Sequence, residues 1–245
     1  LATNMKVGVG GAYFLISRSL GLEVGGAIGI PLYLSQTLSL TLYAYGLAES
    51  LRFVWPEGWF ALPVQLIAGL VVLGVTAVAS RSTALTLKLQ LPIMGLIALA
   101  LFSLFSGVSW TGSRVPNWIS TGAGFWEVFA VFFPAVTGIL AGVSLSGDLK
   151  DPGKAIPRGV LSAVVVGFVV YLAVPVALAN SAPAGIIVDS LVWTQIAALP
   201  ILVLPGLWGA ILSSAFGSIL AAPRTLQALA FDRLAPKALG DIDPE

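Results

Sequence analysis

The sequence predicts an all-α integral membrane protein, and two features of its composition carry that prediction. Of its 245 residues, 58% are hydrophobic and only 9% are charged, whereas soluble domains carry about 25% charged residues. The mean hydropathy is +0.98. The apolar residues also gather in segments of roughly 20 residues, which is the length that a helix needs to cross a bilayer.

The composition also excludes several kinds of chemistry. The chain has no cysteine and no histidine, so it lacks thiols and the commonest general base and metal ligand. Its net charge of +1 indicates no basic surface for nucleic acid. No charged residue lies near the centre of an expected span, and Glu127 comes nearest. We therefore expect no proton relay, no catalytic residue and no enzyme activity.

Six apolar segments are expected to cross the membrane. The residues before them, 1–24, contain Lys6, Arg18 and Glu23 among glycines, which predicts a loop or an interfacial helix. The six spans are expected at residues 25–48, 61–80, 89–105, 125–145, 159–179 and 201–222.

The links between the spans are polar or rich in tryptophan. Trp55 and Trp110 follow the first and third spans, and tryptophan is typical of the membrane interface. The residues Arg81–Lys88 predict a short polar turn after the second span. Pro200 and Pro205 predict a division between an interfacial piece and the last span.

Because the chain begins without Met and stops abruptly in polar sequence, we expect it to be a fragment of a longer polypeptide.

The distribution of Lys and Arg predicts the orientation of the six spans. Ten of the 12 basic residues fall on one side of the membrane, and only Arg52 and Arg114 fall on the other. Lys and Arg gather in cytoplasmic loops. The sequence therefore predicts that the basic loops at residues 81–88, 148–158 and 224–237 are cytoplasmic.

A break is expected in the fourth span, within Phe132–Gly147, FFPAVTGILAGVSLSG. Pro134 removes a backbone donor, Gly138 and Gly142 relax the backbone, and Thr137 adds a hydroxyl. A discontinuous membrane helix exposes carbonyl and N–H groups, which bind substrates and ions in transporters. A proline kink with small residues at a helix–helix contact explains the same residues.

Hydroxyl groups form a line in the first span. Ser35, Ser39 and Tyr43 are spaced four apart, so they share one face of a helix. The line either joins neighbouring helices through hydrogen bonds or faces a cavity, in which the Tyr43 phenol could coordinate an ion.

The last span presents a similar choice. Ala210, Ser213 and Ser214 occupy positions i, i+3 and i+4 of one helix face, and their oxygens would suit a small hard cation. A stripe of small residues at Ala210, Ser214, Ser218 and Ala222 equally predicts close helix packing without a ligand.

Three stretches resemble the cation–chloride cotransporters, which belong to the amino acid–polyamine–organocation superfamily. They are GGAYFLISRSLGLEVGGAIG (10–29), VFAVFFPAVTGILAGVSLSGDLKDPGKAIPRG (128–159) and LSSAFGSILAAPRTLQALAFD (212–232). The resemblance implies a secondary-transporter fold of two inverted repeats of five helices each. This chain would supply about helices three to eight of that fold.

The resemblance also implies three ion sites. For potassium it implies Tyr43, Pro134 and Thr137, and for chloride the backbone N–H groups of Gly138, Ile139 and Leu140. For sodium it implies Ala210, Ser213 and Ser214. Sodium-coupled members of the family have this serine pair, and members that ignore sodium lack it. The resemblance implies no cofactor and no metal beyond the transported ions.

The implied function is sodium-coupled potassium–chloride symport by alternating access. Two alternatives stay open: a sodium-independent potassium–chloride cotransporter, and an amino acid permease in which residues 138–140 hold a carboxylate. The expected partners are membrane lipid and small inorganic ions, without nucleic acid, and a homodimer is compatible with them. The short loops favour a prokaryotic protein of the cytoplasmic membrane. Because further ligands of the family lie on its first and tenth helices, the chain alone is not expected to transport.

Overall fold

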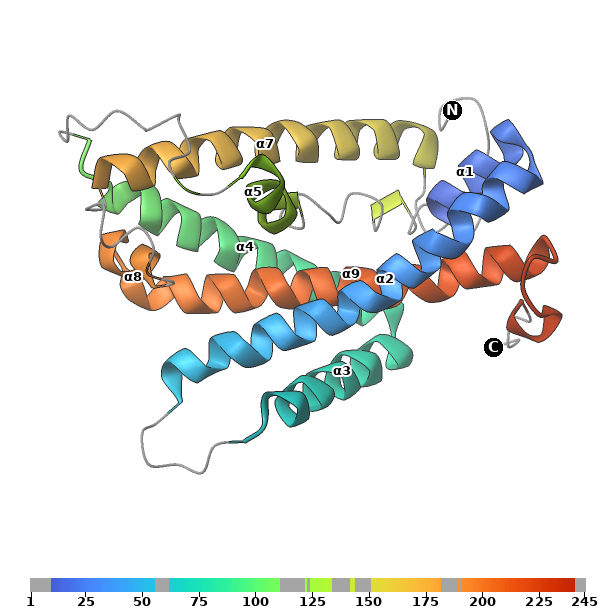
Figure 1. The fold of residues 1–245 in the computed structure, drawn as a ribbon, viewed down its shortest axis with the longest axis horizontal. Helices are drawn as coiled ribbons and strands as arrows, with labels where there is room; N and C mark the ends of the chain where they lie inside the picture. The colour runs from blue at the N-terminus through green and yellow to red at the C-terminus, as the bar shows by residue number, and fades with distance from the viewer. Residues whose placement is uncertain are drawn as a thin grey trace. The chain divides into compact units, whose positions relative to one another are not determined.

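The structure, a computed structural model, confirms the all-α prediction. It describes residues 10–55, 62–110, 122, 124–133, 142–143, 151–181, 189 and 191–240. Within these ranges the chain forms helices and no strand (Figure 1). Four helical segments there are long and apolar enough to cross a membrane: Val64–Arg81, Thr83–Gly107, Gly153–Ser181 and Pro200–Phe231.

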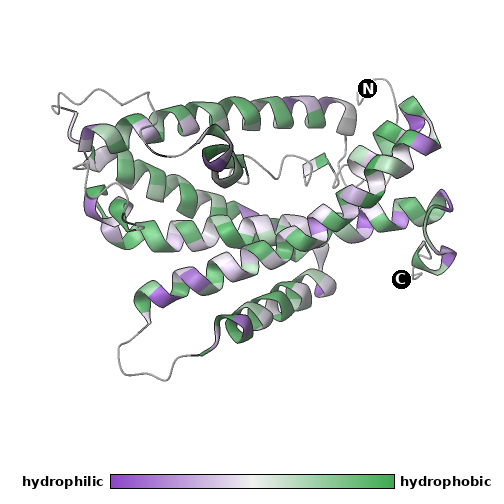
Figure 2. Ribbon diagram, in the orientation of Figure 1, coloured by the Kyte–Doolittle hydropathy of each residue, from purple (hydrophilic) through white to green (hydrophobic). Residues whose placement is uncertain are grey.

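The long helices expose large apolar side chains, as helices in contact with lipid or with further apolar helices do. Hydrophobic residues cover most of α4 (Thr83–Gly107) and α7 (Pro152–Ser181) (Figure 2). Leu73, Phe102 and Leu161 are all more than half exposed. In water such surfaces would be costly, at about 25 cal/mol per Å² of apolar area.

The chain divides into two compact units. The first comprises residues 1–89, 138–162 and 211–245, and the second comprises residues 90–137 and 163–210. The boundary between the units crosses α4, α7 and α9 (Val203–Phe231), so each of these three helices contributes to both units.

The first unit contains a pair of helices joined at a tight corner. Helix α1 (Gly11–Leu20) and helix α2 (Leu22–Leu51) meet at Gly21, whose φ of 93° is a conformation that favours glycine. A side chain at Gly25 would collide with Ser17. Glycine at these two positions therefore lets α2 turn back closely against α1.

Helix α2 also packs along α3 (Val64–Arg81) (Figure 1). The contact consists of small side chains around one larger one: Ala44, Ala48, Ile67 and Ala68 are all buried. The 3-10 helix η1 (Arg52–Val54) follows α2 directly. Alanines at the contact let the two helices approach closely, as small residues do between membrane helices.

The end of α9 packs against α1 and α2 in the same unit. Tyr13, Ala228 and Leu229 form one buried cluster. Deeper along α2, the Thr225 hydroxyl donates a hydrogen bond to Gln36 Oε1 at 3.0 Å, and Thr225 is fully buried. A buried polar pair of this kind favours one alignment of the two helices, because a shift would break the hydrogen bond between them.

Polar contacts also join α1 to the residue that follows α9. The Tyr13 hydroxyl donates a hydrogen bond to Asp232 Oδ2 at 2.7 Å, and Arg18 Nη2 forms an ion pair with Oδ1 of the same carboxylate at 2.7 Å. Burial and the hydrogen bond to Asp232 raise the pKa of Tyr13 to about 12. The Tyr13 hydroxyl therefore remains protonated, and remains a donor, at neutral pH.

The second unit contains α5 (Phe125–Phe132), α8 (Val192–Ile196), the 3-10 helix η4 (Pro200–Leu202) and parts of α4, α7 and α9. Glu127 begins α5 by accepting a hydrogen bond from the Gly124 N–H at 3.0 Å. This places Glu127 in the first turn of α5, where a carboxylate interacts favourably with the helix dipole.

The prediction of a turn at Arg81–Lys88 is wrong. Helix α4 begins at Thr83, and Ser82 alone interrupts the helical backbone. The Ser82 hydroxyl accepts a hydrogen bond from the Leu85 N–H at 3.2 Å, as an N-terminal capping residue does. The other basic loops are also partly helical, because α7 includes residues 152–158 and α9 continues through Pro223 to Phe231.

The helices extend beyond the predicted spans for a simple reason. Hydropathy marks only the apolar part of a helix, whereas Lys, Arg, Gln and Leu are all good helix formers and allow it to continue into polar sequence. The residues before the first span are also helical from Gly11, at α1.

Candidate functional site

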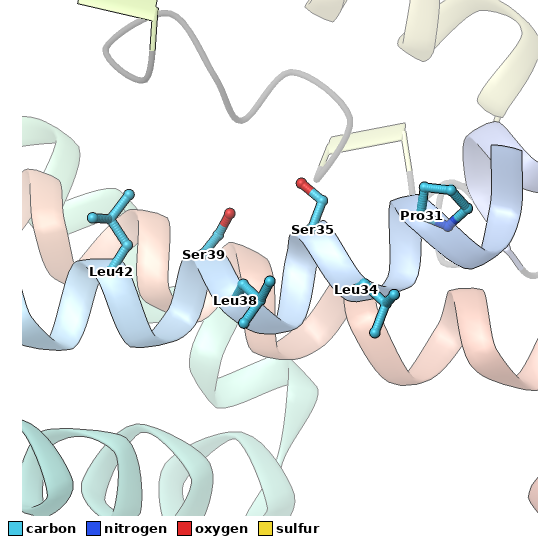
Figure 3. A pocket seen from close by; sticks show the side chains of 6 residues that line it. All are labelled: Pro31, Leu34, Ser35, Leu38, Ser39 and Leu42. Carbon is cyan, nitrogen blue, oxygen red and sulfur yellow. The ribbon is translucent and has the colours of Figure 1, made fainter. Parts of the chain in front are cut away.

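The hydroxyl line of α2 lies at a groove. Pro31, Ser35 and Ser39 line it together with three leucines, and the groove has a volume of about 560 Å³. Figure 3 shows the two serine hydroxyls pointing to the same side of α2. Ser35 is exposed and Ser39 is half-buried. Within the described residues, these two hydroxyls therefore lie at the groove and not in a buried contact.

Tyr43 follows Ser39 by one turn of α2 and is half-buried, but it does not line this groove. Its neighbour Ala44 is fully buried at the contact with α3. Tyr43 therefore lies at the border between the packed and the open faces of α2.

The sodium-site residues predicted on α9 differ in exposure. Ala210 and Ser213 are half-buried and Ser214 is exposed, whereas Ser218 and Ala222 are buried. Packing against neighbouring helices therefore accounts for Ser218 and Ala222. Ser214, by contrast, is not buried by such packing in the part of the chain that the structure describes.

Most of the predicted break, residues 134–141 and 144–147, lies outside the described residues. Helix α5 ends at Phe132, and the site residues that follow it are Pro134, Thr137, Gly138, Ile139 and Leu140. Of the remaining site residues, Tyr43, Ser213 and Ser214 belong to the first unit, and Ala210 is the last residue of the second.

Sequence reasoning missed the polar contacts that hold α9 to α1 and α2. Gln36 and Thr225 are polar residues within apolar segments, and this was the available signal for a buried pair. Tyr13, Arg18 and Asp232 gave no comparable signal, because Tyr13 and Asp232 are 219 residues apart. In the described ranges, no three acidic side chains lie close enough to hold a metal ion.

Comparisons with known proteins agree on one superfamily. The family model described as "Amino acid permease" matches residues 1–244. Solute carrier family 12 member 2 is 28% identical in Squalus acanthias and 30% identical in Mus musculus, over 96% of this chain and 25% of each relative. An uncharacterized transporter of Schizosaccharomyces pombe is 32% identical over 96% of this chain and 26% of that protein.

The chain thus spans about a quarter of the length of the curated relatives that it matches. The matches extend over nearly the whole chain, including the three stretches on which the family resemblance was drawn. They confirm the similarity to the cation–chloride cotransporters and the reading of the chain as a piece of a permease fold.

Proposed function

Because the chain belongs to the amino acid permease family, we propose that it forms part of a sodium-coupled potassium–chloride symporter. The ions would be carried by alternating access, in which the sites open to one side of the membrane at a time. Members of this superfamily's inverted-repeat folds hold ions and substrates near the middle of the bilayer.

The observation that carries this proposal is the pair of adjacent serines on α9, Ser213 and Ser214, of which Ser214 is exposed. Alkali cations bind oxygen ligands, and transporters supply these from hydroxyls and carbonyls near broken or half-buried helices. Ser213, Ser214 and the backbone oxygen of Ala210 would hold sodium. The exposure of Ser214 supports this role, because an ion can reach an exposed residue.

Potassium and chloride would bind next to one another. The Tyr43 hydroxyl and the oxygens of Pro134 and Thr137 would hold potassium, and the N–H groups of residues 138–140 would hold chloride. A single charge near the bilayer centre is costly, and a neighbouring ion of the opposite sign reduces that cost. This charge balance explains why such a symporter would carry both ions together.

An amino acid permease is a second candidate, because the matching family model carries that description. In this case the N–H groups of residues 138–140 would bind the carboxylate of the substrate. The serine pair of α9 would bind sodium in both cases. The two candidates therefore differ in the anionic group that residues 138–140 hold, which is chloride in one and a substrate carboxylate in the other.

Rubidium uptake, as a tracer of potassium, tests the proposal. Liposomes would carry the longer polypeptide that we expect to contain this chain. Uptake would be measured with and without external sodium, and with chloride replaced by gluconate. We expect uptake to require both ions.

The other outcomes each favour a different transporter. Uptake that needs chloride and ignores sodium would indicate a sodium-independent potassium–chloride cotransporter. Uptake without chloride dependence would contradict the symporter, and labelled amino acids would then be tested in the same liposomes.

A further inference from the structure

One face of α4 makes a continuous contact with the chain that leads into α9. The residues of this face are spaced three and four apart, so they lie on one side of the helix. We call it the α4 seam, and it consists of Ile93, Leu96, Ala100, Ser103 and Gly107. All of it, and all of its contacts described below, belong to the second unit.

The C-terminal end of the α4 seam is held by hydrogen bonds. The Ser103 hydroxyl donates to the Leu199 carbonyl at 3.1 Å and accepts from the Leu199 N–H at 2.8 Å. The Ala198 N–H donates to the Ser103 carbonyl at 2.9 Å. Ser103 is buried, at 2% exposure, so water does not compete for these bonds. The segment before α9 is therefore fixed to α4.

Glycines hold the rest of the α4 seam at close range. A Cβ atom at Gly107 would overlap the Ile196 carbonyl, and a Cβ at Gly206 would overlap the Ala100 Cβ. At Gly209 it would lie 3.3 Å from Ile93 Cγ2, which is tighter than ordinary contact. The backbone of α9 thus rests directly on α4 from its first turns up to Gly209.

This contact ends where the proposed sodium site begins. Gly206 lies one turn before Ala210, and Gly209 is its direct neighbour. In a rigid helix, a displacement of the backbone at either glycine moves Ala210, Ser213 and Ser214 together. It therefore shifts them relative to the further ion ligands that the family resemblance implies on other helices. Binding sites tolerate displacements of only about 0.5 Å before affinity is lost.

We propose that Gly206 and Gly209 are positioning residues that set the sodium affinity by holding α9 against the α4 seam. The inference rests on the proposed function, because it takes Ala210 as a sodium ligand. It adds that residues without any contact to the ion determine how well the ion binds.

Alanine substitutions of graded severity test this inference. Gly206→Ala introduces a strong overlap and Gly209→Ala a mild one. Gly95→Ala is the matched control, because it lies on α4 itself with no atom within 4 Å of the added Cβ. The double variant Gly206→Ala with Ala100→Gly moves the methyl group from one side of the contact to the other and should restore the spacing.

The readout is the sodium concentration that gives half-maximal rubidium uptake by the full-length polypeptide in liposomes. We expect it to rise roughly fivefold or more in Gly206→Ala and about twofold in Gly209→Ala, since small misplacements of ligands weaken sites steeply. Gly95→Ala and the double variant should resemble the unaltered protein. The potassium requirement and the maximal rate should change less than the sodium requirement in every variant.

Each other result counts against the inference. A sodium requirement that is the same in Gly206→Ala, Gly209→Ala and Gly95→Ala would overturn it, as would a double variant that is no better than Gly206→Ala. If Gly206→Ala fails to reach the membrane, the sodium requirement of Gly209→Ala is compared with that of Gly95→Ala, and that of the double variant with the unaltered protein. An unchanged requirement in Gly209→Ala would then overturn the inference. If the unaltered protein needs no sodium, the proposed function itself is wrong and the inference falls with it.

Discussion

Ser213 and Ser214 are adjacent in the chain, yet their surroundings differ. Ser213 is half-buried and Ser214 is exposed, while Ser218, one turn further along α9, is buried at 8% exposure. The small residues of α9 therefore have two roles along one face of the helix. Those towards its end pack against neighbours, whereas Ser214 near its middle is exposed.

Replacing the serine pair separates these two roles. We expect Ser213→Ala with Ser214→Ala to raise the sodium concentration for half-maximal rubidium uptake by roughly thirtyfold, because two charge–hydroxyl interactions of about 1 kcal/mol each are lost. Thermal stability should change little. The matched control is Ser218→Ala, which removes a buried hydroxyl of the same helix. A normal sodium requirement in the double variant would remove the proposed sodium site.

At the scale of helices, α1 and the end of α9 are joined through one carboxylate. Asp232 accepts from the buried Tyr13 hydroxyl and from Arg18, and its side chain is only 10% exposed. The Arg18 guanidinium also lies over the Phe14 ring, 5.3 Å from its centre. Because two partners hold the same carboxylate, the contact resists rotation as well as separation of the two helices.

Tyr13→Phe should therefore destabilise the protein. The hydrogen bond from Tyr13 to a carboxylate is worth about 1.5–3 kcal/mol, and the ring itself would remain packed. Thermal unfolding of the purified full-length protein in detergent measures the loss. Tyr45→Phe is the control, because that tyrosine lies on the exposed face of α2. Equal unfolding temperatures for the two variants would show that the Tyr13 hydroxyl contributes nothing.

The same contact predicts sensitivity to alkaline pH. A tyrosine in the unfolded chain has a pKa of about 10, and burial and Asp232 raise the pKa of Tyr13 to about 12 in the fold. The stability that depends on the protonated hydroxyl is thus fully present below pH 10 and is lost as the pH rises towards about 12. In Tyr13→Phe, the loss of unfolding free energy between pH 10 and about 12 should therefore be smaller than in the unaltered protein, because the hydroxyl that loses its proton is absent.

For the molecule as a whole, the asymmetry of Lys and Arg predicts which ends face the cytoplasm. Two short 3-10 helices offer a direct comparison: η1 carries Arg52 and η5 (Lys237–Leu239) carries Lys237, and both side chains are exposed. The sequence places Arg52 on the outer side and Lys237 on the cytoplasmic side.

Single cysteines at these two positions test the orientation. The chain contains no cysteine of its own, so Arg52→Cys and Lys237→Cys can each be labelled without interference from it. We expect a membrane-impermeant thiol reagent to label Arg52→Cys in intact cells and Lys237→Cys only after permeabilisation. The reverse pattern would invert the topology, and labelling of both from outside would contradict an odd number of crossings between them.

Local chemistry was enough to predict the class of fold and to name candidates for the site. Apolar content and segment length indicated membrane helices, because the cost of placing polar groups in lipid applies to any such chain. The hydroxyls of Ser35, Ser39, Ser213 and Ser214 could be named from spacing alone. Their surroundings could not, because exposure depends on which helices lie next to them.

The tertiary structure decided where the helices end and how they are held together. Residues 83–88 and 224–231 are helical because hydrogen bonds within a helix continue past its apolar part, whereas hydropathy marks only that part. The Tyr13–Asp232 contact and the α4 seam join residues far apart in the chain. Sequence alone determined which segments can cross lipid and which residues are candidates for binding ions. Packing determined which of them meet, because contacts between helices depend on their alignment in space.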